Sequence, residues 1–161
     1  MKFIKETIEA IVYADQAELP ESVQRLVETA IQAAKNAYSP YSRFKVGAAI
    51  ELENGEVVTG NNQENAAYPS GLCAERTAAF YAAAHYPGQP FKRIVITSIN
   101  PAQPSEKPVT PCGACRQALI EYEQKFNVPV EIWLAAEKGE IIHLKSIRDL
   151  LPFSFGATYL K

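Results

Sequence analysis

The sequence has no apolar run that approaches the ~20 residues needed to cross a bilayer as a helix. Its first six residues also lack the continuous apolar stretch of a secretory signal peptide. A hydrophobic fraction of 47% and a charged fraction of 21% are ordinary for a water-soluble globular protein. We therefore expect a cytoplasmic protein that has no membrane partner.

An excess of positive charge is also lacking. The 16 Lys and Arg residues are outnumbered by 18 Asp and Glu residues, which gives a net charge of −2, and they form no basic stripe. A protein that binds a long polynucleotide normally carries a basic surface, because neutralised phosphates supply most of its non-specific affinity. The charge balance thus argues against a nucleic-acid partner.

Cysteine and histidine are scarce, with three and two residues respectively. An odd number of cysteines cannot all pair within one chain, and disulfides are rare in a reducing compartment. A disulfide scaffold is therefore excluded. The three cysteines lie in two short segments with glycine and proline nearby, which is a pattern more typical of a site than of a packed core.

Apolar periodicity predicts one domain over residues 1–161, with no repeat and no linker. Residues 1–19 form an N-terminal extension to which we assign no role; its β-branched residues slightly favour an edge strand over a helix. Helices are expected from residue 20 to about residues 38–40, over 73–85 and over 112–126. Strands are expected over 44–52, 57–61, 94–97, 130–136 and 141–144, with a proline-rich loop over 100–111.

The turn and the order of these elements predict the fold class. Asn54-Gly55 is a strong hairpin signal between the first two strands. Strands that alternate with helices of this length indicate a sheet covered on both faces. We therefore expect an α/β fold, a three-layer α/β/α sandwich with a mixed sheet of about five strands.

The cysteine spacing indicates a metal site. Cys112 and Cys115 are three residues apart, so at a helix N-terminus they lie on one face and can bind one ion. Pro111 suits the first helical positions, which do not need its missing N–H. Cys73 opens another predicted helix. Two helix N-termini would then meet at one site, and their free N–H groups favour thiolate over thiol.

Three thiolates with an open fourth position are typical of a catalytic zinc site, whereas a structural site closes with a fourth protein ligand. His85 lies about three helical turns beyond Cys73, which is too far to share its metal. His143 falls in the last short strand, and we predict a structural or surface role for it. The sequence therefore predicts one catalytic Zn²⁺ per chain.

Glu75 and Arg76, which lie just after Cys73, complete this chemistry. Zn²⁺ lowers the pKa of a bound water to ~7, and a nearby group that is not a ligand must then carry protons. Glu75 is placed for that role. Three thiolates leave the metal shell more negative than two thiolates and a histidine would, and Arg76 is predicted to offset this by bonding the sulfurs. The bland alternative for Arg76 is a solvent-exposed helix position.

Three other interpretations of the cysteines remain open. A Cys-x-x-Cys pair can be a redox motif, but that leaves Cys73 and Glu75 unexplained. A carboxylate could close a structural zinc site in a binding module. The cysteines could also simply pack in the core. The order of Cys, Glu and Pro-Cys-x-x-Cys is the signature of zinc deaminases, which favours an enzyme over all three.

Over residues 23–160 the chain resembles the small cytidine deaminases. Four parts carry the resemblance: residues 37–49 (AYSPYSRFKVGAA), residues 60–68 (GNNQENAAY), the two metal segments, and residues 150–156 (LLPFSFG). The metal segments are common to many deaminases, whereas the other parts are typical of the nucleoside branch. Two departures are the long N-terminal extension and Ala157, where a proline often stands.

The resemblance implies roles for further residues. Asn62 and Glu64 would bind the ribose hydroxyls, which suits them because an amide and a carboxylate can together serve one hydroxyl, while a carboxylate repels phosphate. At the base, the resemblance implies contacts from Phe44, from the main chain of Cys73 and Ala74, and from the Thr110 carbonyl, which would bind the departing amino group. Ala66 and Tyr68 would contact the 5′ end of the substrate. Phe155 would come from a neighbouring subunit.

The family therefore implies zinc-dependent hydrolytic deamination of cytidine and deoxycytidine, as part of pyrimidine salvage, by a homotetramer whose subunits share active sites. Bound partners would be a small nucleoside and no nucleic acid. Two rivals stay open within the superfamily: a deaminase of another aminopyrimidine nucleoside, and a polynucleotide-editing enzyme. The third is a zinc module without turnover.

Overall fold

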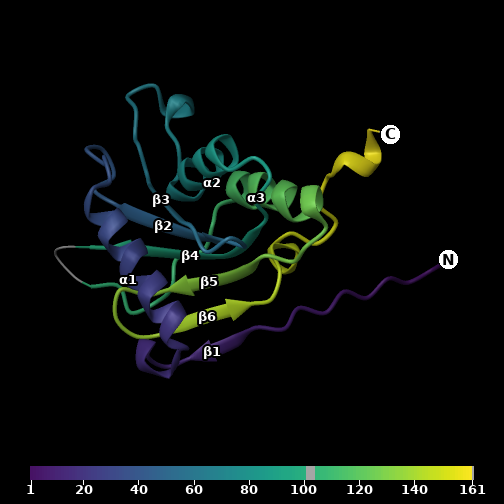
Figure 1. Ribbon diagram of the computed structural model, residues 1–161, viewed down its shortest axis with the longest axis horizontal. Helices are drawn as coiled ribbons and strands as arrows, with labels where there is room; N and C mark the ends of the chain where they lie inside the picture. Colours follow the sequence, from purple (N-terminus) through teal and green to yellow (C-terminus); the bar gives the residue numbers. More distant parts are fainter. Residues whose placement is uncertain (101–103, 161) are drawn as a thin grey trace.

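The computed structural model describes residues 1–100 and 104–160. Helices on both faces of one sheet give three layers, with the sheet in the middle (Figure 1). Strand order across the sheet is β1-β6-β5-β4-β2-β3. The strands are β1 (Ile11–Tyr13), β2 (Lys45–Leu52), β3 (Val57–Asn61), β4 (Phe91–Ile99), β5 (Glu131–Ala135) and β6 (Ile141–Leu144). The helices are α1 (Glu21–Lys35), α2 (Ala74–His85) and α3 (Gly113–Phe126).

The sheet is mixed because one pair of neighbours is parallel. β4 and β5 run parallel and are connected through α3, while every other neighbouring pair is antiparallel. The β2–β3 hairpin turns at Gly55, whose φ of 87° lies in the left-handed region that favours glycine. The predicted fold class is confirmed, with six strands in place of about five.

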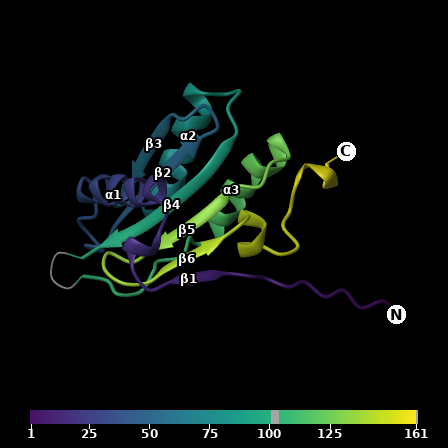
Figure 2. The same ribbon diagram turned by 60° about the horizontal axis from the view of Figure 1, so that its bottom comes forward.

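Each face of the sheet has its own core. On one face α1 packs against β2, β4 and β5 through Val23, Leu26, Val27 and Ala30. On the other face α2 and α3 cover the sheet, as the turned view in Figure 2 also shows. The buried residues of α1 recur at steps of three and four, so burying one stripe of the helix accounts for its position.

The close approach of β3 to the start of α2 positions the functional region. A Cβ on Gly60 would lie 2.5 Å from the Ala74 carbonyl oxygen and 2.4 Å from the Ala78 nitrogen. Such distances are far below van der Waals contact, so the backbone of β3 touches the helix only because residue 60 has no side chain. The end of β3 therefore lies beside the N-terminus of α2.

Most predicted elements are confirmed, and α1 is the clearest correction. It ends at Lys35 rather than near residues 38–40. The chain leaves the helix early because Tyr38 bonds to the strand extension after β3: its N–H donates to the Asn62 carbonyl, and its own carbonyl accepts from the Glu64 N–H. β4 is longer than the predicted strand over 94–97. Residues 104–111 are irregular as predicted, and residues 101–103 of that loop lie outside the described residues.

The N-terminal extension contributes the sixth strand. β1 pairs with β6 at one edge of the sheet, which confirms the predicted edge strand. Residues 1–10 are all exposed and run outward from β1 (Figures 1 and 2). Among the described residues, no helix is both long and apolar enough to cross a membrane.

Candidate metal centre and active site

The three cysteines come together at two helix N-termini. Cys73 is the N-cap residue of α2, and Cys112 is the N-cap residue of α3. Cys115 lies in the first turn of α3, where it is fully buried. The Sγ atoms of Cys73 and Cys112 are 3.9 Å apart, those of Cys112 and Cys115 are 3.5 Å apart, and all three lie within 4.8 Å of one another.

This spacing fits a tetrahedral zinc ion. With Zn–S bonds of about 2.3 Å, sulfurs at the corners of a tetrahedron are separated by about 3.8 Å. In the part of the chain that the structure describes, these cysteines are the one group of metal-binding type. Neither histidine joins them: the His85 ring stacks on Tyr81, and the His143 ring stacks on Trp133. Three protein sulfurs therefore leave a fourth position for a water or substrate.

The surroundings of the sulfurs favour a thiolate. A hydrogen bond from the Cys115 thiol, together with the nearby Arg76 guanidinium, lowers the pKa of Cys73 to about 5. The Cys115 thiol donates to that thiolate and is buried, and both effects raise its pKa. The free N–H groups at the two helix N-termini add positive potential at the same place. These groups thus stabilise the thiolate form of Cys73, which is the form that binds a metal ion.

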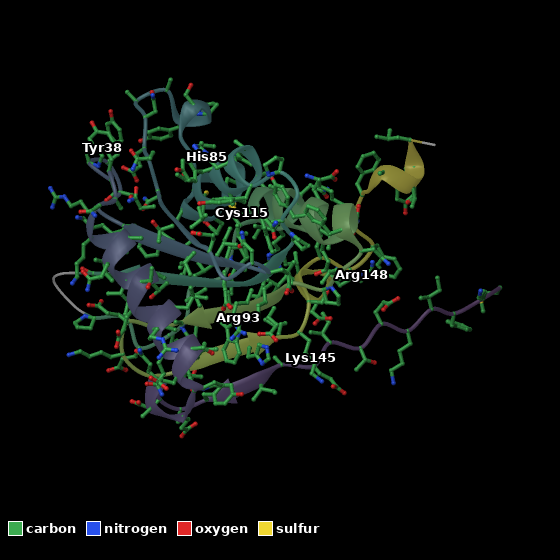
Figure 3. The ribbon with its side chains drawn as sticks, viewed as in Figure 1. Tyr38, His85, Arg93, Cys115, Lys145 and Arg148 are labelled. Atoms are coloured by element: carbon green, nitrogen blue, oxygen red, sulfur yellow. The ribbon has the colours of Figure 1, made fainter. Side chains whose placement is uncertain are left out.

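Two residues on the first turn of α2 flank the sulfurs. Glu75 is 4% exposed, and its burial raises the pKa of its carboxyl group above the usual value, as does the negative charge of Cys73. The Arg76 Nη2 lies 4.0 Å from the Cys73 Sγ, while its buried Nε has no partner. Figure 3 shows the side chains of this region, with Cys115 labelled at α3. A buried carboxyl group and a positive charge thus adjoin the three sulfurs.

A cavity of about 430 Å³ extends from Cys73 and Arg76 to the loop before β2 and to the end of β3. It is lined by Cys73 and Arg76 at one end and by Asn62, Glu64 and Tyr68 at the other. Such a volume suits a small organic molecule rather than a folded macromolecule. One of the three cysteines, Cys73, and the two predicted sugar residues therefore line one hollow.

Asn62 and Glu64 are held by backbone groups. The Asn62 Oδ1 accepts from the Val46 N–H at 2.7 Å, and its Nδ2 donates to the Phe44 carbonyl at 2.9 Å. The Glu64 Oε2 accepts from the N–H groups of Tyr41 and Ser42 at 2.9 and 3.2 Å. The hydrogen bonds from Ser42, chiefly that of its hydroxyl, hold the pKa of Glu64 below its usual value. Both side chains are therefore fixed before any ligand binds.

Other predicted substrate residues lie apart from this cavity in the single chain. Phe44 is 47% exposed and lines a different hollow, together with Ser98 and Lys107. Phe155 is 56% exposed, and its carbonyl accepts from the Gln117 side chain on the outer part of α3. Neither ring is among the residues that line the shared hollow.

The remaining predicted positions lie around the site. Ala74 is buried at the start of α2. Ala66 and Thr110 are exposed loop residues, in the segments before α2 and before α3 respectively. Tyr68, 75% exposed, packs edge-on against Tyr41 with ring centroids 6.0 Å apart.

Sequence reasoning missed Ser42 and Tyr41, although both lie in a segment that carries the family resemblance. Their contribution is a backbone conformation and a hydroxyl, and neither leaves a residue-type signal like that of a cysteine cluster. The unusual conformation next to this serine, in which Arg43 has a φ of 59°, is visible only in the structure. Only the folded loop shows that these groups converge on Glu64.

Comparison with known proteins gives a consistent result. Residues 20–130 match the family described as "Cytidine and deoxycytidylate deaminase zinc-binding region". A cytidine deaminase of Halalkalibacterium halodurans is 40% identical over 134 residues, which cover 83% of this chain and 94% of that protein. A cytidine deaminase of Sporosarcina psychrophila is 38% identical over 133 residues, covering 83% of this chain and 90% of that protein. The crystal structure of a cytidine deaminase from Burkholderia pseudomallei superposes with a TM-score of 0.71 at 38% identity, covering 85% of this chain and all of that one.

Replacing Cys115 by serine is expected to weaken metal binding at least about 100-fold, because the loss of a direct ligand should exceed the ~10–100-fold effect of outer-sphere changes. Metal content of the purified protein and competition with a chelator measure this. Ala114→Ser is the matched control, since it adds the same hydroxyl to an exposed position of the same turn. Equal metal affinity in Cys115→Ser and the wild type would contradict the assigned ligand set.

Proposed function

Because the chain belongs to the cytidine and deoxycytidylate deaminase family, we propose that it converts free cytidine and deoxycytidine to uridine and deoxyuridine, with water consumed and ammonia released. The observation that carries this proposal is the shared hollow, which has metal-binding sulfur at one end and the Asn62–Glu64 pair at the other. A reacting base and its sugar would bridge these ends. The reaction places the enzyme in pyrimidine salvage, in the cytoplasm, where free thiols persist.

The metal is one Zn²⁺ per chain, held by Cys73, Cys112 and Cys115. When bound, zinc supplies a water of lowered pKa as the nucleophile for the pyrimidine C4. The sulfur spacing and the open fourth position support this assignment. Main-chain groups of Cys73 and Ala74, and the carbonyl of Thr110, would hold the base and its amino group at that position.

Glu75 moves the protons. Its carboxylate takes a proton from the nucleophilic water and delivers it to N3 of the ring, and a second transfer converts the amino group into ammonia. One water is consumed, the C4–N4 bond breaks, and a C4–O4 carbonyl replaces it. The buried position of Glu75 supports this role because it holds the carboxyl pKa above its usual value, which makes protonation and release by the same group accessible.

Arg76 offsets the charge of the sulfurs. Three thiolates on a divalent cation carry a net negative charge, which makes a bound water less acidic. The guanidinium 4.0 Å from the Cys73 sulfur withdraws some of that charge. This contact favours the charge-balancing role over the solvent-exposed alternative.

The sugar end selects a nucleoside. The Asn62 amide and the Glu64 carboxylate are aimed by backbone hydrogen bonds, and a carboxylate at this place would repel a phosphate. Tyr68 lines the same end of the hollow, and Ala66 lies in the same loop. The net charge of −2 does not favour a polynucleotide as substrate.

The complete site belongs to an assembly. Phe44 would line the base pocket, and Phe155 would cover the base from a neighbouring subunit of a homotetramer. Large exposed aromatic side chains at positions 68, 153, 155 and 159 support an assembly, because each is more than half exposed in the single chain. Sharing of sites would explain why Phe155 lies outside the hollow of its own chain.

A panel of substrates tests the proposed function. Cytidine and deoxycytidine should be deaminated, as followed by the loss of ultraviolet absorbance, while cytosine, cytidine monophosphate and a cytosine-containing oligonucleotide should react far more slowly. Turnover limited to the monophosphate or the oligonucleotide would refute the nucleoside assignment. Bound zinc without turnover of any member would instead indicate a non-enzymatic zinc protein.

Glu75→Gln is expected to lower kcat by at least about 10²–10⁴-fold, the usual contribution of a positioned acid–base group. The amide keeps the shape of the carboxylate, so zinc content and thermal unfolding should stay close to those of the wild type. Glu121→Gln makes the same chemical change on the exposed face of α3 and should retain full activity. A Glu75→Gln enzyme that turns over at the wild-type rate would exclude the proton-carrier role.

A further inference from the structure

The contacts of Glu64 all come from one short loop. Two successive backbone N–H groups, of Tyr41 and Ser42, donate to its Oε2 atom. The Ser42 hydroxyl donates to the other oxygen, Oε1. A carboxylate thus has three donors within residues 41–42, while Glu64 itself follows β3 more than twenty positions later.

Ser42 also has a partner on its other side. Its Oγ accepts a hydrogen bond from the Phe44 N–H at 3.0 Å. Because a hydroxyl has one hydrogen, and that hydrogen is directed to Glu64, accepting from Phe44 fixes the direction of the O–H bond. The hydroxyl therefore connects the carboxylate to the first residues of β2.

The backbone conformation of this loop orients the donors toward Glu64. Arg43 adopts a φ of 59°, which is uncommon for a residue with a side chain, and its N–H donates to the Ser39 carbonyl at 3.0 Å. The turn directs the N–H groups of residues 41 and 42 at one oxygen, as in the small backbone concavities that bind anions. Here the anion is the protein's own carboxylate.

These bonds leave little acceptor capacity on Glu64. A carboxylate offers about four lone-pair directions, and three are used within the protein. Asn62 has likewise used one lone pair on Val46 and one N–H on Phe44. What remains is one acceptor on the Glu64 Oε1, plus one donor and one acceptor on Asn62. That set suits one hydroxyl, which accepts from the amide and donates to the carboxylate.

We propose that Ser42 is a positioning residue that occupies one direction of the Glu64 Oε1 and aims the other at a single sugar hydroxyl of the substrate. This inference rests on the proposed function. Glu64 touches the substrate, whereas Ser42 acts through Glu64. Loss of the Ser42 hydroxyl leaves the carboxylate free to rotate, so the contact with the sugar weakens while the reaction at the base is unaffected.

The test compares Ser42→Ala with Ser42→Thr, which restores the hydroxyl. For cytidine and deoxycytidine, Ser42→Ala is expected to raise KM about tenfold with kcat within about twofold, because uniform binding is lost. For 2′,3′-dideoxycytidine the wild type and Ser42→Ala should have equal kcat/KM values, since no hydroxyl reaches Glu64. Ser42→Thr should recover most of the affinity. A loss of the same size on the dideoxy substrate, or an unchanged KM on cytidine, would overturn the proposal.

A pH profile gives a readout that a merely structural role would not move. The hydrogen bonds from Ser42 hold the Glu64 pKa below its usual value, so Ser42→Ala raises it. A raised pKa means that the carboxylate is lost at a higher pH on acidification, and the acid limb of 1/KM should shift upward. An acid limb that stays in place contradicts the positioning role.

Binding separates this inference from the proposed function. If the wild type deaminates none of the nucleosides, the proposed function fails. Calorimetric binding of uridine and 2′,3′-dideoxyuridine then tests Ser42 without turnover. Weaker binding of uridine by Ser42→Ala, with no change for the dideoxy compound, supports the inference. No binding of uridine by the wild type overturns it.

A second inference concerns residues 1–10, here called the N-terminal arm. All ten residues are exposed, including Phe3, Ile4 and Ile8 with exposed fractions of 84%, 66% and 50%. The arm continues the line of β1, whose outer edge is the free edge of the sheet (Figures 1 and 2). An apolar, extended segment joined to a free strand edge is a template for pairing with another strand.

The charges of the arm restrict how two copies could pair. A two-fold axis perpendicular to an antiparallel pair passes midway between two equivalent residues, one on each strand, so that this residue faces its own copy. Centring on Lys5, Glu6 or Glu9 would place like charges directly opposite each other, which is unfavourable. Centring on Ile8 avoids this but pairs no opposite charges. Centring on Ile4 pairs Lys2 with Glu6 but leaves β1 of the second copy unpaired, and centring on Ala10 pairs Lys5 with Asp15, which lies outside β1.

We infer that two copies of this chain pair their arms antiparallel about Thr7. This register places Lys5 opposite Glu9 and Phe3 opposite Ile11, each of them twice by symmetry. It also brings residues 1–3 opposite β1 of the second copy, where they add a strand to an existing sheet. Charge complementarity and the free edge thus favour a second copy as the partner.

A cysteine at position 7 tests the register. Paired Thr7 residues have Cα atoms about 4.5–5.5 Å apart, within the range of a disulfide, so Thr7→Cys should give a covalent dimer with oxidised glutathione. Glu9→Cys is the control, because the two copies of residue 9 would lie about 13 Å apart along the strands.

Charge reversal then separates the pairing from chance encounters. In the Thr7→Cys background, Lys5→Glu should lower the yield of the covalent dimer, and Lys5→Glu with Glu9→Lys should restore it. Intact mass under non-reducing conditions measures the yield. Equal yields from Thr7→Cys and Glu9→Cys, or no response to charge reversal, would overturn the inference and point to another partner for the arm.

Discussion

The meeting of two helix N-termini over one end of the sheet is the constraint on which the rest of the site depends. α2 and α3 pack on the same face, and each begins with a cysteine whose thiol is not used to cap its own helix. Their free N–H groups and the Arg76 guanidinium stabilise negative charge on sulfur. The same first turn of α2 carries Glu75, so one helix fixes both the Cys73 sulfur and the carboxyl group that we propose as the proton carrier. The small residue at position 60 lets β3 lie directly against that turn.

The other end of the hollow depends on a different feature, a loop whose residues 41–42 donate hydrogen bonds to the Glu64 carboxylate. Glu64 and Asn62 project from the chain just after β3, where that chain also pairs with Tyr38. Their orientation is determined by the backbone of residues 41–46. A site of this kind is preorganised, because the polar groups pay little entropy on binding when their own hydrogen bonds already hold them. The two ends of the hollow are thus positioned by separate elements. The start of α2 forms one end, and the loop before β2 together with the chain after β3 forms the other.

Several features could be predicted from the sequence because their signals are local. The spacing of Cys112 and Cys115, the hairpin at Asn54-Gly55 and the periodic helix after residue 20 each depend on neighbours within a few residues. The predicted end of α1 was wrong because the helix is ended by long-range hydrogen bonds between Tyr38 and the chain after β3. The edge strand in residues 1–19 was favoured only slightly over a helix because β1, three residues long, depends on its pairing with β6 rather than on a local pattern. Ser42 was missed since its partner lies 22 positions away.

The sequence by itself determined the chemical class of the site. Three cysteines without a fourth ligand, and Glu75 two residues after the first of them, predict a metal-binding donor set and a proton carrier, because ligand chemistry resides in residue types. Only the tertiary structure decided that Cys73 and Arg76 line one hollow with Asn62 and Glu64, and that the Glu64 carboxylate already accepts three hydrogen bonds within the protein. It also decided that Phe44 and Phe155 lie outside that hollow in the single chain. The physical reason is that distances across a sheet follow from packing and strand register, which no short stretch of sequence contains.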